Sequence, residues 1–311
     1  MADQLSQKAD IALNDLASGG LLTVGQSNKF IEQLIDTPTI LNEARVVPMD
    51  RPSIELNKTK FGSRVLRCAE DGSGNRAIWS GSRALDSANR SQPDLGRITL
   101  NTKEYIAEVR LPYEVLEDQI ERGGFEDTVM RMLSKRVALD IEELLIQGDA
   151  GNVSDAYLGS QDGILEYVAS NQVDAAGANI SASVFNNAFK AMPTQYRGDL
   201  AALRFYAAHN IVADYRLALA TRQTGLGDEF LTGRSPVYVM GVQMKPVAKM
   251  PNSDIVLIDP KNVLVGFQRN IRIETDKDIQ TREVIIVVTF RLALQIEEEL
   301  AAVRIKNLAV V

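Results

Sequence analysis

The amino-acid sequence predicts an α+β fold, and three patterns support this class. Apolar and polar residues alternate cleanly from Tyr105 to Leu111, which is typical of a strand with one buried face. The next stretch places apolar residues at steps of three and four, which predicts one helix of about 23 residues over 124–147. Beyond residue 200, short apolar runs separated by turn residues predict several further strands.

Length and composition exclude several classes of protein. The chain has 311 residues, of which 45% are hydrophobic and 24% charged, so global disorder is excluded. The longest strongly apolar run, Val284 to Phe290, is too short to span a bilayer, and we expect no membrane contact. The N-terminus lacks the basic and apolar regions of a signal peptide, so we expect the chain to stay in the cytosol where it is made.

Few residues suit catalysis. The single Cys68 excludes an internal disulfide framework, and the single His209 excludes a multi-histidine metal site. The adjacent carboxylates Glu142–Glu143 and Glu297–Glu299 would point to different faces of a helix, and we interpret them as facing solvent. No GxSxG, HExxH, Walker or dinucleotide fingerprint is present. We therefore expect no enzyme, no catalytic residue, no cofactor and no metal, with an acidic α+β carboxylate enzyme as the alternative.

The first part of the chain is interpreted as an arm rather than a core. Apolar residues at helical spacing over 5–16 predict a short helix that ends at Gly19–Gly20. A second short helix is expected over 27–35, and an extended, proline-marked stretch follows over 36–52. Such a segment reaches outward instead of packing on itself.

Residues 53–79 predict a long β-hairpin. Strand-like runs lie on either side of a turn-rich stretch, Glu70 to Asn75, and a polar return path follows over 80–96. Few of these residues could form a core, and a two-stranded ribbon is at best marginally stable in water. The hairpin therefore needs another surface to lie on.

Charge is distributed unevenly along the chain. Residues 45–97 carry ten basic and six acidic side chains, whereas residues 98–143 carry six basic and eleven acidic ones. The net charge of −7 argues against a nucleic-acid reader with a broad basic surface. Blocks of charge are usually solvated faces, but this pair also fits a contact between a hairpin and a neighbouring copy. The predicted contact set is Lys58, Lys60, Arg64, Arg67 and Arg76 on the hairpin, and Glu117, Asp118, Glu121, Glu126 and Asp127 on the acidic strand and helix.

The long helix and the segments after it complete the expected elements. Gly148 is expected to stop the long helix. Downstream, a helix should end at Pro193, a strand should follow over 203–209, and Asn210 should cap the next helix. Short strands are expected over 235–247, 254–259, 262–267 and 271–275, and two closing strands over 283–296 and 301–308.

The order of these elements resembles that of the tailed-bacteriophage major capsid proteins, which have the HK-97-like fold. The segments that carry the resemblance are the arm (30–64), the entry strand (102–118), the long helix (125–151), GILEYV (163–168), an axial-type segment (240–274) and the closing strands (292–308). The resemblance implies an N-terminal arm over 1–45, an extended β-hairpin loop over 46–97, a peripheral domain over 98–178 and 285–311 with a spine helix at 124–147, and an axial domain over 179–284.

The resemblance also implies a function. It implies a major capsid protein that self-assembles into hexamers and pentamers of an icosahedral phage head enclosing double-stranded DNA without sequence-specific binding. Its partners would be copies of itself, a portal protein, and a separate scaffold or cement protein where one is used. Its place would be the virion, after assembly in the host cytoplasm. The alternative shell is an encapsulin-type bacterial compartment. Some members crosslink subunits through a lysine and an asparagine, but Lys58, Lys60 and Asn307 do not align as such a group.

Overall fold

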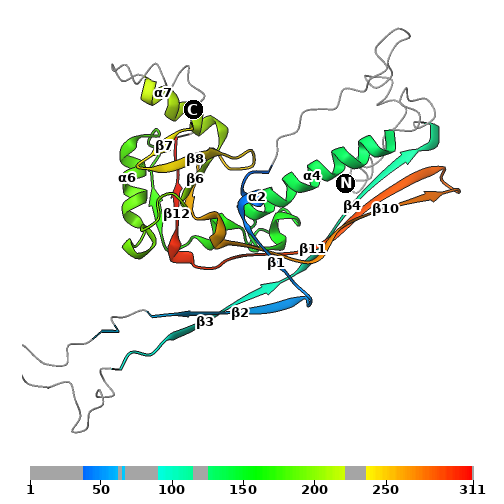
Figure 1. Ribbon diagram of the computed structural model, residues 1–311. Helices are drawn as coiled ribbons and strands as arrows, with labels where there is room; N and C mark the ends of the chain where they lie inside the picture. The colour runs from blue at the N-terminus through cyan, green and yellow to red at the C-terminus, as the bar shows by residue number, and fades with distance from the viewer. Residues whose placement is uncertain (1–37, 62–64, 67–89, 115–124, 221–235, 310–311) are drawn as a thin grey trace, which may run out of the picture. The chain divides into compact units, whose positions relative to one another are not determined.

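The computed structural model describes residues 38–61, 65–66, 90–114, 125–220 and 236–309. Contacts divide the chain into two units, one of residues 53–100 and one of residues 1–52 with 101–311. The smaller unit is a two-stranded ribbon, and the larger unit is an α+β body with two sheets and one long helix (Figure 1).

The first sheet of the larger unit has the strand order β1-β10-β11-β4. Its strands are β1 (Arg45–Pro48), β10 (Val263–Asp278), β11 (Glu283–Ile296) and β4 (Lys103–Pro112). β1 runs parallel to the start of β10, and β11 lies antiparallel between β10 and β4. Alternate residues of β11 from Val284 to Phe290 are buried, because successive side chains of a strand point to opposite faces.

Helix α4 (Phe125–Gln147) covers the buried face of this sheet, and its extent confirms the predicted helix. Its first half packs Val129 and Leu133 against Leu111 and Ile286. Its second half contributes to the main core, with Val137, Ile141, Leu144 and Leu145 all buried. These positions recur at steps of three, four and one, so the predicted apolar stripe is confirmed at the described side chains.

The second sheet has the strand order β5-β12-β9-β6-β8-β7. Its strands are β5 (Gln172–Asp174), β12 (Ala302–Lys306), β9 (Ile255–Ile258), β6 (Arg204–Ala207), β8 (Val242–Pro246) and β7 (Tyr238–Val239). Met240 and Gly241 both have positive φ between β7 and β8, as a two-residue type I′ hairpin turn requires.

Two helices contribute to the core beside this sheet. They are α6 (Ala182–Ala191) and α7 (His209–Ala220). Phe185 of α6 contacts Phe205 of β6 and Tyr215 of α7 edge-on, with both ring centroids at 5.0 Å. The shorter elements are α2 (Ile40–Glu43), η2 (Leu158–Ser160), α5 (Ile164–Tyr167), η3 (Thr194–Tyr196), η4 (Pro260–Asn262) and η5 (Glu299–Ala301). Among the described residues, no helix combines the length and hydropathy that a bilayer span requires.

The smaller unit pairs β2 (Ser53–Lys60) with β3 (Asp94–Asn101). Burial alternates along both strands, so the ribbon has two distinct faces. On one face, the aliphatic stem of Lys58 lies over Gly96, where an added Cβ would come within 2.8 Å of Lys58 Cε. On the other face, Arg97 pairs with Glu55 at 3.2 Å.

Three sequence predictions of secondary structure are wrong. Helix α7 begins at His209, so Asn210 lies inside the helix and does not cap it. The two short strands expected over 262–267 and 271–275 are one strand, β10, because irregularities in its pairing near Arg269 replace the expected turn. The strand that pairs with β2 in the described residues is β3, which begins inside the expected return path. The helices expected over 5–16 and 27–35 and the turn at Glu70–Asn75 lie outside the described residues.

Candidate functional site

The residues predicted to form a contact between copies fall in three places. Lys58 and Lys60 lie on β2 of the ribbon. Glu126 and Asp127 lie in the first turn of α4. The other six, Arg64, Arg67, Arg76, Glu117, Asp118 and Glu121, lie outside the described residues. The contact between copies therefore stays a prediction.

The ribbon exposes large apolar side chains. Leu66 is 84% and Leu95 is 74% exposed, and Phe61 and Val65 are also exposed. Its two strands are paired only with each other in the described part of the chain. Concentrated apolar exposure on a soluble protein marks an interaction surface. Both exposed apolar side chains and basic residues therefore indicate that the ribbon contacts another surface. The distribution of charge along the sequence predicted only the basic residues of this surface.

A groove of about 370 Å³ lies along α4 and the edge strand β4 of the larger unit. The sheet contributes Tyr105, Ile106, Ala107 and Phe290, the helix contributes Arg136, Val137, Asp140 and Glu143, and the following loop contributes Asp155, Tyr157 and Leu158. Three of these side chains are acidic and one is basic. Ile106 is exposed, so the groove offers an apolar contact beside an acidic rim. The acidic partner surface predicted from the sequence comprises residues earlier in the chain, at 117–127.

The phenol groups in this groove act as structural hydrogen-bonding groups. Tyr157 OH donates to Asp140 O at 2.6 Å, and Tyr105 OH lies 2.7 Å from Ser160 Oγ. Burial raises the pKa of both phenols above the ordinary value of 10.0. Burial also raises the pKa of the Asp140 carboxyl, although the guanidinium of Arg136 lowers it. The phenols therefore stay protonated at neutral pH and suit shape and recognition rather than proton transfer.

The C-terminal end of α4 is held by a contact between two glycine backbones. Gly163 N–H donates to Gly148 O at 2.8 Å, and Gly148 N–H donates to Leu144 O at 2.9 Å. Gly148 does not have the left-handed conformation typical of a helix stop. It is a glycine because an added Cβ would lie 2.7 Å from Leu144 O and closer still to Gln161 O. The predicted helix stop at Gly148 is thus confirmed, since α4 ends at Gln147, and close backbone approach is the reason that this position is a glycine.

Gln161, next to this contact, connects the loop to the first sheet. Its Nε2 donates to Leu292 O at 2.9 Å and to Tyr105 OH at 2.8 Å. Its Oε1 accepts from Leu294 N–H at 3.0 Å. One buried amide therefore fixes the loop against both β11 and β4.

Glu142 contradicts the prediction that the paired carboxylates face solvent. Its side chain is 0% exposed, and its Oε1 accepts from Thr39 N–H and Ile40 N–H, both at 2.6 Å. The side chain of Thr39 does not cap the N-terminus of α2, and the carboxylate of Glu142 accepts the backbone N–H groups there instead. The neighbouring Glu143 pairs with Lys249 at 2.7 Å. The two carboxylates thus have structural partners that lie about one hundred residues away in sequence.

A second carboxylate holds the same junction from the other side. Glu43 of α2 accepts from Tyr206 OH at 2.6 Å and pairs with Lys245. Burial tends to raise the pKa of Glu43, but its hydrogen bonds with Lys245 and Tyr206 bring it below the usual value. Residues 39–43 are therefore tied to α4 through Glu142 and to the second sheet through Glu43.

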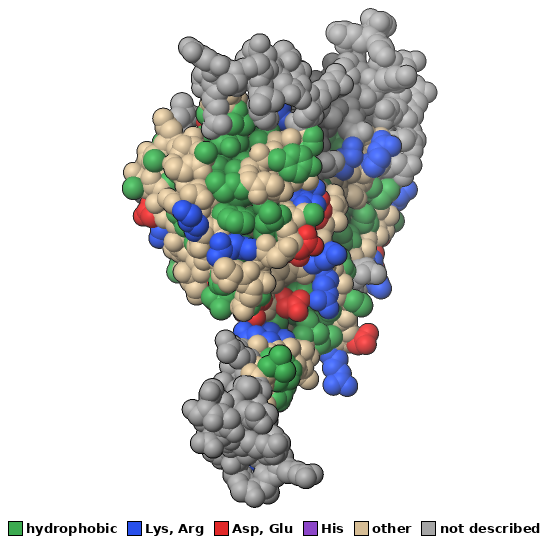
Figure 2. Space-filling model, turned by 60° about the vertical axis from the view of Figure 1, so that its left-hand side comes forward, with side chains coloured by type: hydrophobic (Ala, Val, Ile, Leu, Met, Phe, Trp, Pro, Cys, Tyr) green, Lys and Arg blue, Asp and Glu red, His purple; other side chains and the backbone are tan. Residues whose placement is uncertain are grey.

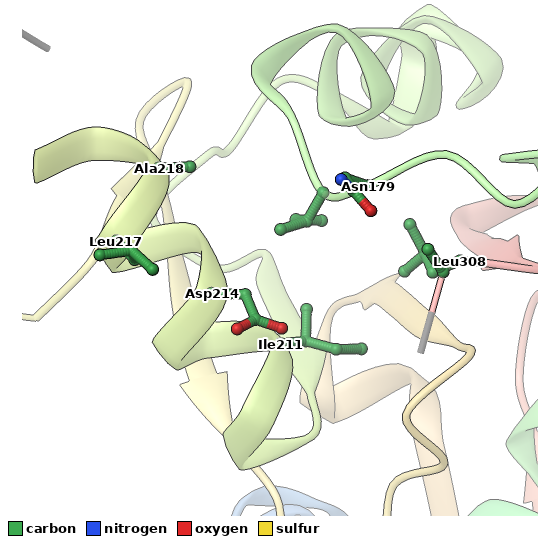
Figure 3. A pocket seen from close by; sticks show the side chains of 8 residues that line it. Asn179, Ile211, Asp214, Leu217, Ala218 and Leu308 are labelled. Atoms are coloured by element: carbon green, nitrogen blue, oxygen red, sulfur yellow. The ribbon is translucent and has the colours of Figure 1, made fainter. Parts of the chain in front are cut away.

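A further pocket of about 310 Å³ lies beside α7 (Figure 3). Ile211 and Leu217 line it from the helix and Leu308 lines it from the segment after β12. Asp214 is the one titratable side chain among its described lining residues, so no acid–base pair is formed there.

The described residues also hold no cluster of three or more His, Cys, Asp or Glu side chains placed to bind a metal. Figure 2 shows charges of both signs and apolar side chains interspersed on one face.

Comparison with known proteins places these features in a family. The model of the phage capsid family matches residues 19–307. A prophage capsid protein of Bacillus subtilis (strain 168), YqbE, is 40% identical over 314 residues, which cover 97% of each chain. The capsid of a native GTA particle matches with a TM-score of 0.66 at 19% identity, covering 96% of this chain and 100% of that one. The satellite phage P4 procapsid matches with a TM-score of 0.62 at 12% identity, covering 95% and 97%.

Proposed function

This chain belongs to the phage capsid family, and from that membership we propose how its two units build a shell. It is a major capsid protein with the HK-97-like fold, a structural component of a virion and not an enzyme. Copies of the chain form a homo-oligomeric shell. The ribbon of one copy lies over the α4 and β4 surface of a neighbour. The exposed side chains of the ribbon and the composition of the groove support this placement.

The observation that carries the proposal is the separateness of the ribbon. Residues 53–100 form their own unit, and that unit exposes Phe61, Val65, Leu66 and Leu95. Burying apolar surface contributes about 25 cal/mol per Å², so these side chains favour a second surface strongly. The groove along α4 and β4 offers Ile106 together with an acidic rim, which matches the basic character of residues 45–97.

The domain roles follow the same proposal. Residues 1–45 act as the arm, 46–97 as the extended loop, 98–178 and 285–311 as the peripheral domain with α4 as its spine, and 179–284 as the axial domain. The axial domains meet at the centres of hexamers and pentamers, which close into an icosahedral head. The head, assembled in the host cytoplasm, encloses double-stranded DNA, and a portal protein occupies one vertex. The net charge of −7 suits a wall that does not bind this cargo tightly.

Removing the exposed apolar side chains of the ribbon is expected to stop assembly without unfolding the subunit. In the variant Phe61→Ser/Leu66→Ser, each contact loses about 1.5–3 kcal/mol of apolar burial per side chain, and the loss repeats at every interface. Negative-stain microscopy and gel filtration should show unassembled chain with a native circular-dichroism spectrum. Val153→Ser is the control, because Val153 is an even more exposed apolar side chain but lies in the larger unit. Normal shells from the double variant would contradict the proposed contact of the ribbon with a neighbouring copy.

Charge reversal on the ribbon tests the electrostatic half of the contact. Exposed ion pairs contribute roughly 0–1 kcal/mol each, so they set the register of the contact more than its strength. The variant Arg64→Glu/Arg67→Glu is expected to leave a folded chain that fails to form uniform particles. The measurement is the particle size distribution at low salt, with Arg64→Lys/Arg67→Lys as the charge-conserving control. Uniform particles from the reversed variant would refute the electrostatic contact.

A further inference from the structure

Strand β10 has a long edge that no described strand covers. It runs for sixteen residues, Val263–Asp278, but β1 pairs only with its first part, from Leu264 to Phe267. On the other side, β11 pairs with β10 from end to end. From Arg272 to Asp278 the backbone is regular in its pairing with β11. Among the described strands, none pairs with the outer edge of this stretch, and such an edge is a template for another strand.

The side chains of this edge alternate between charged and apolar. Ile271 and Ile273 share one face and are 45% and 36% exposed. Arg272 and Glu274 share the other face and pair with each other at 3.3 Å. The buried neighbour of Ile273 across the sheet is Val288 of β11, so the isoleucines extend the apolar face of the sheet to its rim. A strand added at this rim would cover them.

We propose that the β10 edges of two copies pair antiparallel about a two-fold axis, with Ile273 opposite Ile273, an inference that rests on the proposed shell. In such a pairing residue i of one copy lies opposite residue j of the other, and residue j of the first copy lies opposite residue i of the second, so each contact forms twice. Directly opposite side chains point to the same face of the sheet, so i and j differ by an even number and the axis lies at one residue position. The occupant of the edge is therefore a second copy of the same strand.

The charges select this register among its neighbours. With Ile273 on the axis, Arg272 of each copy lies opposite Glu274 of the other, and Ile271 lies opposite Thr275. With Thr275 on the axis, Arg272 would lie opposite Asp278, but Glu274 would lie opposite Asp276 twice, which is destabilising, and Ile273 would lie opposite Lys277. With Ile271 on the axis, Arg272 would lose its charged partner. Of these three registers, the one centred on Ile273 combines opposite charges across from each other with isoleucine against isoleucine, and it places no like charges opposite each other between Ile271 and Thr275.

The pairing joins two three-stranded parts, β4-β11-β10 from each copy, into one continuous sheet. The contact is isologous, because the same edge of each copy forms it. It also covers a strand edge that would otherwise be open to non-specific pairing and aggregation. Pairing by strand addition uses main-chain hydrogen bonds for affinity and the alternating side chains for specificity. The ribbon and the β10 edge then supply two separate contacts per copy in the shell.

Disulfide crosslinking tests the register directly. Opposite residues in antiparallel strands have Cα atoms about 4.5 or 5.5 Å apart, and both distances suit a disulfide. Wild-type shells are the reference, and in Cys68→Ser/Ile273→Cys shells treated with a mild oxidant the dimer is expected to be the main band on a non-reducing gel. Cys68→Ser/Ile279→Cys is the control, because Ile279 is 85% exposed but lies six positions from the axis, about 40 Å from its own copy. A dimer band no stronger at 273 than at 279 would overturn the pairing.

Charge exchange supplies a second readout. In the Cys68→Ser/Ile273→Cys background, Arg272→Glu places like charges opposite Glu274 twice and should lower the dimer yield by roughly tenfold. Adding Glu274→Arg restores opposite charges and should restore the yield, whereas an exchanged variant as poor as the single one would contradict the register. If the wild-type chain forms no shells, the proposed function itself fails. Shells that form normally and never crosslink at 273 remove the edge pairing alone.

Discussion

Replacing Gly148 by alanine is expected to lower the free energy of unfolding by more than about 3 kcal/mol, enough to remove most soluble protein. The added Cβ would lie 2.7 Å from Leu144 O, 3.0 Å from Gly163 N and closer still to Gln161 O. All three obstacles are backbone atoms, so no change of rotamer relieves them. Moving the 161–163 backbone away would also withdraw Gln161 from Leu292, Leu294 and Tyr105. Urea unfolding followed by circular dichroism measures the loss.

Gly198→Ala is the matched control for this prediction. A Cβ at Gly198 meets no atom within 4 Å, so the same glycine-to-alanine change adds no steric contact there. We expect Gly198→Ala to change the free energy of unfolding by less than about 1 kcal/mol. If Gly148→Ala were as stable as Gly198→Ala, the backbone contact at the end of α4 would have no structural importance.

Periodicity predicted the elements whose burial is set within the element itself. The apolar stripe of α4 fixed its length and its buried face, since Val137, Ile141 and Leu144 recur at helical steps. The alternation of β4 likewise placed Val109 and Leu111 on the side that packs against α4. These patterns need no knowledge of the rest of the chain. The order of the elements was then enough for the resemblance that the family comparison confirmed.

The start of α7 at His209 differs from the prediction by a local shift, whereas the other features that the sequence did not show depend on distant partners. Glu142 was interpreted as facing solvent because the sequence does not show that Thr39 and Ile40 bring two backbone N–H groups to it. Gly148 stops α4 as predicted, but nothing near it in sequence shows the approach of Gln161, which is why the position is a glycine. The unbroken course of β10 depends on β11, which holds both halves in one ladder across the irregular positions near Arg269.

The sequence predicted a ribbon that contacts a partner surface, but it did not predict which residues form that surface. The low core content and basic excess of residues 45–97 indicated a ribbon that needs a partner surface. The acidic groove was not predictable, because its rim combines Asp140 and Glu143 of α4 with Asp155 of the next loop. Side chains from separate elements meet only after the chain has folded, and charge counted along the sequence cannot bring them together.

Glu142→Ala is expected to destabilise the subunit by about 3 kcal/mol, because two buried N–H groups lose their acceptor. Thr39 N–H and Ile40 N–H have a carboxylate oxygen at 2.6 Å, and Ile40 is itself fully buried in the core. Glu142→Gln keeps an acceptor in the same place and should lose only about 1 kcal/mol. The control is Glu143→Ala, which removes a partly exposed ion pair with Lys249 and should lose about 1 kcal/mol or less. Equal losses in Glu142→Ala and Glu143→Ala would contradict the assigned role.

The same carboxylate predicts a pH dependence opposite to ordinary acid denaturation. Burial raises the pKa of Glu142 above 4.5, although the N–H groups of Ile40, Thr39 and Leu41 lower it in part. The folded chain then binds this proton more strongly than the unfolded chain does. The contribution of Glu142 to stability therefore grows as pH falls from the raised pKa toward 4.5, and it is lost as pH rises through that range. Because glutamine does not titrate, the wild type should gain stability relative to Glu142→Gln on acidification. Urea unfolding of both chains from neutral pH down to 4.5 measures this difference. A difference that stays constant would show that Glu142 has the same pKa in the folded and unfolded chains.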